Sequence, residues 1–166
     1  MPVEEWLSER VPGWSDLHEA EKRALRDFPI LWSYFEGWVT NTKTANPKLI
    51  QEKIDSQPAA SFNNLNATHL AYDHYRNRFF PNGVEAPLFS TIGLTGSYRD
   101  LVKQTLLDEG SEPRQRAKAV LMLINRLRNN FLHGEKGLYN FRGQLENFSH
   151  ANSTLMELLP IWGPPR

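Results

Sequence analysis

Residues 113–134 read PRQRAKAVLMLINRLRNNFLHG and carry the clearest helical pattern in the chain. Apolar side chains recur every three or four positions, which is the spacing of one face of an α-helix. That face is formed by Val120, Ile124, Leu127 and Phe131, and the adjoining line by Leu121, Asn125, Arg128 and Leu132. Pro113 suits a first helical turn, and Gly134 suits the position after the last one. The stretch therefore predicts a long core helix with polar residues beside its buried face.

The remainder of the chain also has helical spacing, and the strict alternation of a β-strand is almost absent. Helical patterns cover residues 16–28, 30–39, 49–54, 67–80, 97–108 and 141–159. Pro29 either kinks the first helix or starts a new one, and residues 84–95, which have no clear period, are expected to form an ordered loop. We therefore expect one all-α domain over residues 1–166, a bundle of about five to seven helices. It would carry an N-terminal extension (1–14) and a C-terminal tail (160–166).

The composition is that of an ordinary globular domain. Of the 166 residues, 23% are charged and 40% are apolar, which is typical of folded water-soluble proteins. No apolar run approaches the roughly 18 residues of a membrane span, and the N-terminus lacks the basic and apolar segments of a signal peptide. We therefore expect a cytoplasmic protein without a membrane partner. The absence of cysteine excludes disulfide bonds, thiolate metal sites and cysteine nucleophiles.

Positive charge is concentrated around the long helix, although the whole chain is balanced with 19 basic and 19 acidic residues. Between Pro113 and Arg142 there are seven basic residues and one acidic residue, Glu135. Between Met1 and Ile30 there are four basic and seven acidic residues. A local basic excess suits the approach of a phosphate backbone, but a solvated helix face has the same composition. Both interpretations therefore stay open.

The C-terminal end of the long helix collects polar groups that are able to do chemistry. Asn129 and His133 are four residues apart and share a helix face, whereas Arg128 lies about 140° from His133. The three side chains can share one pocket only where the helix frays, at Gly134. A helix that ends in Arg, His and Gly is also an ordinary stop signal. Spacing alone therefore fits both a reactive site and a structural helix end.

The segment Arg128-Asn129-Asn130-Phe131-Leu132-His133 resembles the motif of the HEPN superfamily, in which an arginine and a polar residue are followed by three residues and a histidine. The resemblance implies an all-helical bundle with this motif at the C-terminal end of the penultimate helix. It also implies a metal-independent endoribonuclease that needs no cofactor and cleaves RNA by attack of the 2′-OH. The Arg/His site would be composite, formed by the two chains of a homodimer.

Other members of the superfamily broaden the expectation. Some HEPN domains only bind or scaffold, so the alternative is a noncatalytic nucleotide-binding or protein-interaction module. Many related proteins are toxins or parts of phage defence, which makes an antitoxin or another regulatory protein a candidate partner. Some members carry a tyrosine two residues after the histidine as a modification target, whereas this chain has Glu135 there. Control through that tyrosine is therefore not expected.

The resemblance assigns roles to the residues of the motif. His133 is the expected base or acid, because an imidazole near its usual pKa of about 6.5 exists in both forms at neutral pH. Arg128 would hold the phosphate with its planar fork, Asn129 would position His133 or contact the substrate, and Arg126 would support Arg128. Further substrate contacts are expected from Asn125, Asn130, Lys136 and Arg76, with Tyr75 and Arg78 as base-stacking or phosphate candidates on the same helix as Arg76.

A third hypothesis, from a different class, rests on the predicted helix 67–80. His69 and Asp73 are one turn apart there and His74 follows, and imidazole and carboxylate groups are common metal ligands. With His150 as a further ligand, these residues would make a metal-dependent helical-bundle hydrolase. The Glu-rich pattern of such bundles is missing, and a buried or interfacial polar cluster explains the same residues.

Overall fold

The computed structural model describes residues 1–41, 44–132 and 143–163, and these residues form helices without any β-strand. The α-helices are α1 (Val3–Arg10), α2 (Glu19–Tyr34), α3 (Pro47–Asp55), α4 (Asn66–Phe79), α5 (Pro87–Thr91), α6 (Gly96–Leu107), α7 (Pro113–Leu132) and α8 (Leu145–Leu158). A π-helical segment, Phe35–Thr40, continues α2. Four short 3₁₀ turns also occur in the described ranges: Trp14–Asp16, Ala59–Phe62, Pro81–Gly83 and, after α8, Leu159–Trp162. The predicted all-α class is confirmed. None of the helices in these ranges has the length and apolar character needed to span a membrane.

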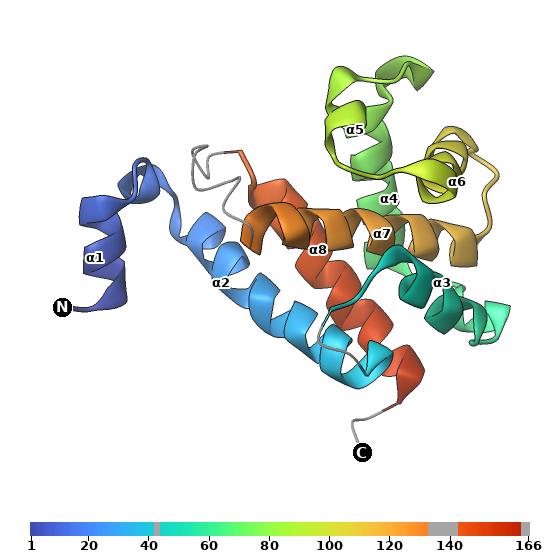
Figure 1. Ribbon diagram of the computed structural model, residues 1–166, viewed down its shortest axis with the longest axis horizontal. Coiled ribbons are helices and arrows are strands. Elements are labelled where there is room, and N and C mark those ends of the chain that lie inside the picture. Colours follow the sequence, from blue (N-terminus) through green and yellow to red (C-terminus); the bar gives the residue numbers. More distant parts are fainter. Residues whose placement is uncertain (42–43, 133–142, 164–166) are drawn as a thin grey trace.

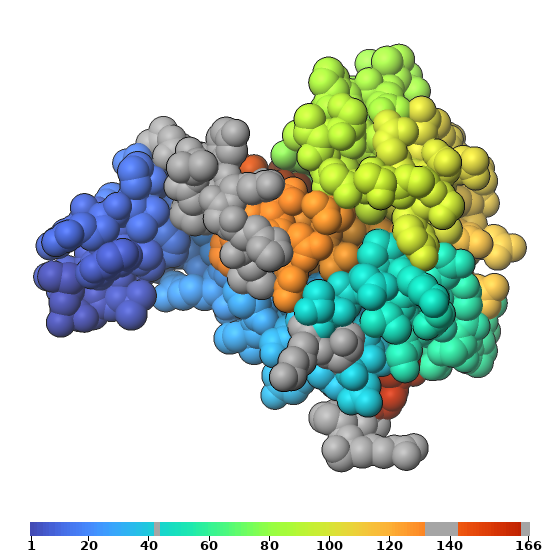
Figure 2. Space-filling model, in the orientation of Figure 1, coloured from blue at the N-terminus to red at the C-terminus, as the bar shows by residue number. Residues whose placement is uncertain are grey.

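The helices pack as a bundle around α8 and α7 (Figure 1). Helix α8 lies against α2 and α4, while α7 packs against α3, α4 and α6. Helix α1 projects from one end of the molecule and contacts mainly the 3₁₀ turn that follows it (Figure 2). Arg128 and Asn129 lie on the last turns of α7, which is the penultimate α-helix in the described ranges, as predicted.

The buried face of α7 is the apolar line that the sequence predicts. Val120 and Ile124 are fully buried, and Leu127 is 9% exposed. At the end of this line three phenylalanine rings from three helices meet edge to face: the ring of Phe148 in α8 is centred 5.1 Å from that of Phe28 in α2 and 5.2 Å from that of Phe131 in α7. This contact ties α2, α7 and α8 together beside the Arg128 motif.

The N-terminal half differs from the prediction in how α2 begins and continues. The helix starts after His18, whose backbone N–H donates to Glu21 Oε2 at 2.9 Å, and not at residue 16, where the predicted pattern begins. Pro29 lies inside α2, although an internal proline removes one helical hydrogen bond and costs about 3 kcal/mol. Burial of the side chains around it, including Trp32 at 2% exposed, offsets that cost.

Two segments that lack a clear sequence pattern are helical. The expected loop 84–95 contains the single-turn helix α5, whose first residue is Pro87. The expected extension 1–14 contains α1, none of whose residues is buried. These additions give eight α-helices in the described ranges instead of five to seven.

Candidate functional site

The guanidinium of Arg128 is held between α7 and the π-helical segment that follows α2. Its Nη1 donates to Asn129 Oδ1 at 3.0 Å, and its Nη2 lies 3.4 Å from Glu36 Oε1. The two charged side chains are only 14% and 11% exposed. Arg128 is therefore an oriented, nearly buried cation with a carboxylate counter-charge.

Glu36 is a component of this site that the sequence analysis did not identify. It lies on the segment Phe35–Thr40, and its Oε1 also accepts from the backbone N–H of Ala45 at 2.8 Å. Short π-helical segments are frequent at functional sites. Glu36 is 92 positions from Arg128 in the chain, so no local spacing relates the two. The only available signal was an acidic residue inside an otherwise apolar stretch.

A small pocket of about 130 Å³ adjoins Arg128. Its walls come from α2, the π-helical segment and α7: Phe28, Pro29, Trp32, Ser33, Glu36, Arg128 and Phe131. Two side-chain donors of these residues, Arg128 Nε and Trp32 Nε1, are buried and have no acceptor among the described residues. Each atom exposes less than 1 Å², so a ligand with acceptor oxygens would reach them only if the pocket walls moved.

The other polar residues of α7 do not join Arg128. Arg126 and Asn130 lie on the other side of the helix and line a separate groove, and Arg126 Nε donates to the carbonyl oxygen of Ile92 at 2.8 Å. Arg126 thus does not support Arg128, because two positions on a helix differ by about 160° in direction. Asn125, a predicted substrate contact, is 1% exposed in the core.

The remaining predicted residues of the site are spread over the chain. His133 and Lys136 lie outside the described residues, so their placement relative to Arg128 stays a prediction. Arg76 lies on α4 and pairs with Glu109, which engages it in an ion pair away from Arg128. Of the predicted motif, the structure brings together Arg128 and Asn129.

The histidines of α4 do not assemble the metal site of the third hypothesis. His69 Nε2 lies 3.6 Å from Asp73 Oδ2 on an exposed part of the helix, whereas His74 faces α8, with Nε2 2.8 Å from Asn147 Oδ1. His69 and His74 are five positions apart, so their side chains differ by about 140° in direction. In the described ranges no three histidine or acidic side chains are placed to hold one metal ion. The predicted ligand set His69, Asp73, His74 and His150 is therefore wrong.

His74 and His150 instead stack between α4 and α8, with ring centroids 4.6 Å apart. Burial lowers the pKa of His150, the neighbouring His74 lowers it further, and Glu146 opposes both effects. In the unfolded chain a histidine titrates near pH 6.5. The folded state therefore binds a proton at His150 less readily than the unfolded chain does. The contribution of neutral His150 to the free energy of unfolding is fully present above about pH 6.5 and is lost as the pH drops below that value.

We expect His150→Gln to reduce this pH dependence. Urea unfolding of the wild type at about pH 8 and about pH 5 should show a larger loss of stability on acidification than the variant shows. Met156→Gln, at an exposed position of the same helix as His150, is the matched control and should show the pH dependence of the wild type. An equal loss in wild type and His150→Gln would contradict the prediction.

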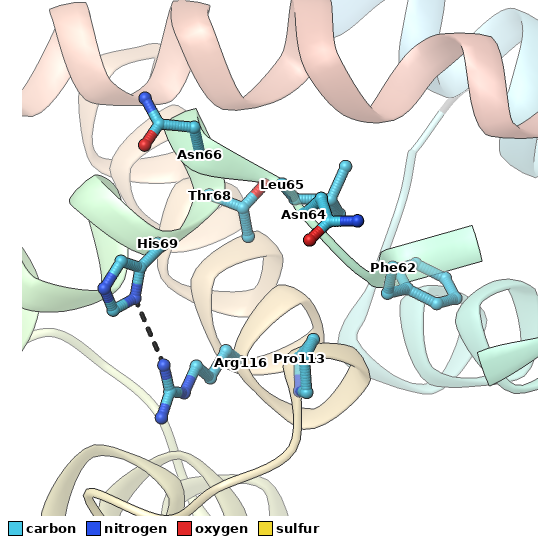
Figure 3. Close-up of a pocket in the computed structure, with 8 residues that line it drawn as sticks. All are labelled: Phe62, Asn64, Leu65, Asn66, Thr68, His69, Pro113 and Arg116. Atoms are coloured by element: carbon cyan, nitrogen blue, oxygen red, sulfur yellow. Dashed lines mark hydrogen bonds between the residues drawn. The ribbon is translucent and has the colours of Figure 1, made fainter. Parts of the chain in front are cut away.

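A larger pocket, of about 300 Å³, lies beside the N-terminus of α4 (Figure 3). Arg116 reaches into it from α7, but its Nη1 lies 3.1 Å from His69 Nδ1 and its Nη2 donates to the Glu109 carbonyl oxygen at 2.6 Å. Two N–H groups in the first turn of α4 donate to the carboxylate of Glu157. The cation and the helix N-terminus are thus already engaged. This pocket is about 18 Å along α7 from Arg128.

Comparisons with known proteins add no relative. No family model matches the chain, and neither a curated protein nor a solved structure matches it. Function must therefore be argued from the motif and from the geometry around Arg128.

Proposed function

We propose that the protein is a metal-independent endoribonuclease of HEPN type. The observation that supports the proposal is the arginine of the Arg128–His133 motif, which is nearly buried, oriented by Asn129 and Glu36, and placed beside a pocket. A phosphate-binding arginine needs this kind of preorganisation, because donors fixed before the reaction cost no reorganisation in the transition state. An arginine that only ended a helix would not need two side-chain partners.

The proposed reaction divides the chemistry between Arg128 and His133. A base removes the proton of the ribose 2′-OH, and the 2′-oxygen attacks the phosphorus. The 5′-oxygen leaves and takes a proton from an acid, which gives a 2′,3′-cyclic phosphate and a 5′-OH. Arg128 stabilises the negative charge of the phosphorane oxygens. His133 is the base or the acid, and two copies in a dimer would supply both roles.

The pocket beside Arg128 suits a phosphate in its donor chemistry. Arg128 Nε and Trp32 Nε1 both lack an acceptor among the described residues. Phosphate oxygens are strong acceptors, and a movement of the pocket walls that exposed these buried donors would let a phosphate pair with them. Glu36 would act as a positioning residue, since its carboxylate fixes the guanidinium of Arg128 at the pocket wall.

A homodimer contact on the outer face of α2 would bring two such pockets together. Ile30 is 60% exposed and Tyr34 is 54% exposed, and these exposed fractions are high for large apolar side chains on a folded surface. They follow Pro29 and Ser33, which line the pocket beside Arg128. In a contact with two-fold symmetry, the same surface patch of each of the two chains packs against its copy on the other chain. The two pockets would then face one another across the axis, as a composite site requires.

The second candidate is a noncatalytic module of the same fold. The observation that favours it is the ion pair itself, because Glu36 neutralises the charge of Arg128. An arginine whose charge is compensated attracts a phosphate less strongly. The two candidates differ in whether RNA is cut.

The test is an assay of purified full-length protein with total RNA and a labelled single-stranded RNA in excess EDTA. We expect cleavage that leaves 2′,3′-cyclic phosphate ends and that is lost in His133→Ala. Arg23→Ala, at an exposed position of α2 with no hydrogen bond or ion pair in the described ranges, is the matched control and should cut as the wild type. No cleavage by folded wild-type protein would reject the ribonuclease and favour the binding module.

A further inference from the structure

A second polar groove lies on the side of α7 that faces away from Glu36. It is formed by α4, α5, α7 and the start of α8, and has a volume of about 90 Å³. Two arginines from different helices line it, Arg78 of α4 and Arg126 of α7, together with Asn130 one turn beyond Arg126. None of its lining residues is acidic. The groove therefore carries positive charge with no compensating carboxylate on its walls.

Most other cations of the bundle are compensated. Ion pairs join Arg99 and Lys103 to Glu85, Lys118 to Asp55, Arg76 to Glu109, and Arg128 to Glu36. Within the described ranges Arg78 and Arg126 have no such partner, and Arg78 makes no hydrogen bond. Both side chains are half-buried. Two uncompensated, partly desolvated cations at one groove favour an anionic ligand, because attraction is stronger away from bulk water.

The position of Arg126 is fixed by backbone groups. Its Nε donates to the Ile92 carbonyl oxygen at 2.8 Å. Gly93 follows with φ +80°, and a Cβ built there would lie 2.4 Å from Arg126 Nη2. Only glycine leaves room for the guanidinium against the chain at this position. The side chain is thus ordered before any ligand arrives, and binding costs less conformational entropy.

The walls offer apolar surface next to these donors. Tyr75 and Phe79 of α4 are buried and nearly parallel, with ring centroids 6.1 Å apart, and Leu88 of α5 is 41% exposed at the rim. The amide of Asn130 has no hydrogen-bond partner among the described residues and can donate or accept. An amide and a pair of cations at a groove of this size suit a phosphate group.

We propose that the groove between α4, α5 and α7 binds the phosphate group of a nucleotide or of an RNA strand through Arg78 and Arg126. Their planar guanidinium groups come from two helices and hold the phosphate oxygens between them. This binding does not require the ribonuclease activity proposed above. On an RNA nuclease it would hold the strand at a second point, away from Arg128.

The test measures binding in full-length protein that carries His133→Ala, so that RNA is not consumed. Two probes are used: a fluorescein-labelled single-stranded RNA, followed by anisotropy, and AMP, followed by calorimetry. Arg78→Gln and Arg126→Gln should each weaken binding about tenfold, the loss expected for one charge-assisted contact. For the RNA, the slope of log Kd against log salt should fall by about 0.7 in each variant. Arg23→Gln is the matched control and should bind as its parent.

The two probes separate the sources of the phosphate. AMP binding that weakens in both variants identifies a single nucleotide as sufficient, whereas RNA binding that weakens without AMP binding identifies a strand. Arg78→Gln removes no hydrogen bond of the described residues, so it tests the groove without loss of the Ile92 contact. Unchanged affinity for both probes in the folded Arg78→Gln and Arg126→Gln proteins overturns the proposal. Failure of RNA cleavage in wild type would reject the ribonuclease and leave this result unaffected.

Discussion

Arg128→Ala is expected to lower the rate of RNA cleavage by about 100-fold to 1,000-fold, the usual loss when one preorganised donor to transition-state charge is removed. The structure gives the reason, because the nearest arginine in the sequence, Arg126, cannot replace it: Arg126 lies on the other side of α7 and contacts Ile92. Initial rates with labelled single-stranded RNA in EDTA measure the effect. Arg128→Lys should recover little, since a single ammonium group cannot reproduce the fork.

The same substitution also affects folding, and a second variant separates the two effects. Without Arg128 the carboxylate of Glu36, which is 11% exposed, has no counter-charge, and breaking such a pair costs about 3 kcal/mol or more. The double variant Glu36→Gln/Arg128→Gln removes both charges and keeps similar shapes. We expect it to recover much of the lost stability, measured by urea unfolding, while cleavage stays as low as in Arg128→Ala. A folded double variant that cuts at the wild-type rate would exclude Arg128 from the chemistry.

The sequence predicts the parts of this fold that depend on repeated spacing. The line Val120, Ile124 and Leu127 is buried as its spacing of three to four residues requires. Prediction was wrong where a few residues act against local rules. Of the two alternatives for Pro29, the start of a new helix is wrong, because α2 continues through it and tertiary packing outweighs the lost hydrogen bond. Helix α5 was missed because it is too short to display a period.

The site is less accessible to sequence reasoning than the fold. Arg128 and Asn129 could be proposed because they are adjacent in a motif. Glu36 could not, since its pairing with Arg128 depends on how α2 and α7 pack and not on any local spacing. The grouping of Arg78 with Arg126 has the same origin, because α4 and α7 come together only in the folded bundle. The sequence pointed to all three arginines, but only the folded bundle places Arg128 on one side of α7 and Arg126 with Arg78 on the other.

Phe148→Ala is expected to destabilise the protein by about 3–5 kcal/mol, the range for removing a buried phenylalanine ring. Phe148 is fully buried in α8, and its ring contacts those of Phe28 and Phe131 edge to face. The change removes apolar burial, the aromatic contacts and the packing of three helices at once. Since a domain is stable by only about 5–15 kcal/mol, a large part of the total is lost.

The measurement is thermal and urea unfolding followed by circular dichroism, with a Tm expected to fall by about 10 °C. Met156→Ala, at a 56% exposed position of the same helix, is the matched control and should stay within about 0.5 kcal/mol of wild type. The ring cluster also holds the last turns of α7, because Phe131 lies three residues after Arg128. Cleavage by Phe148→Ala should therefore be lost at lower temperature than in wild type. Equal stability of Phe148→Ala and Met156→Ala would contradict the packing of α2, α7 and α8 on which the proposed site depends.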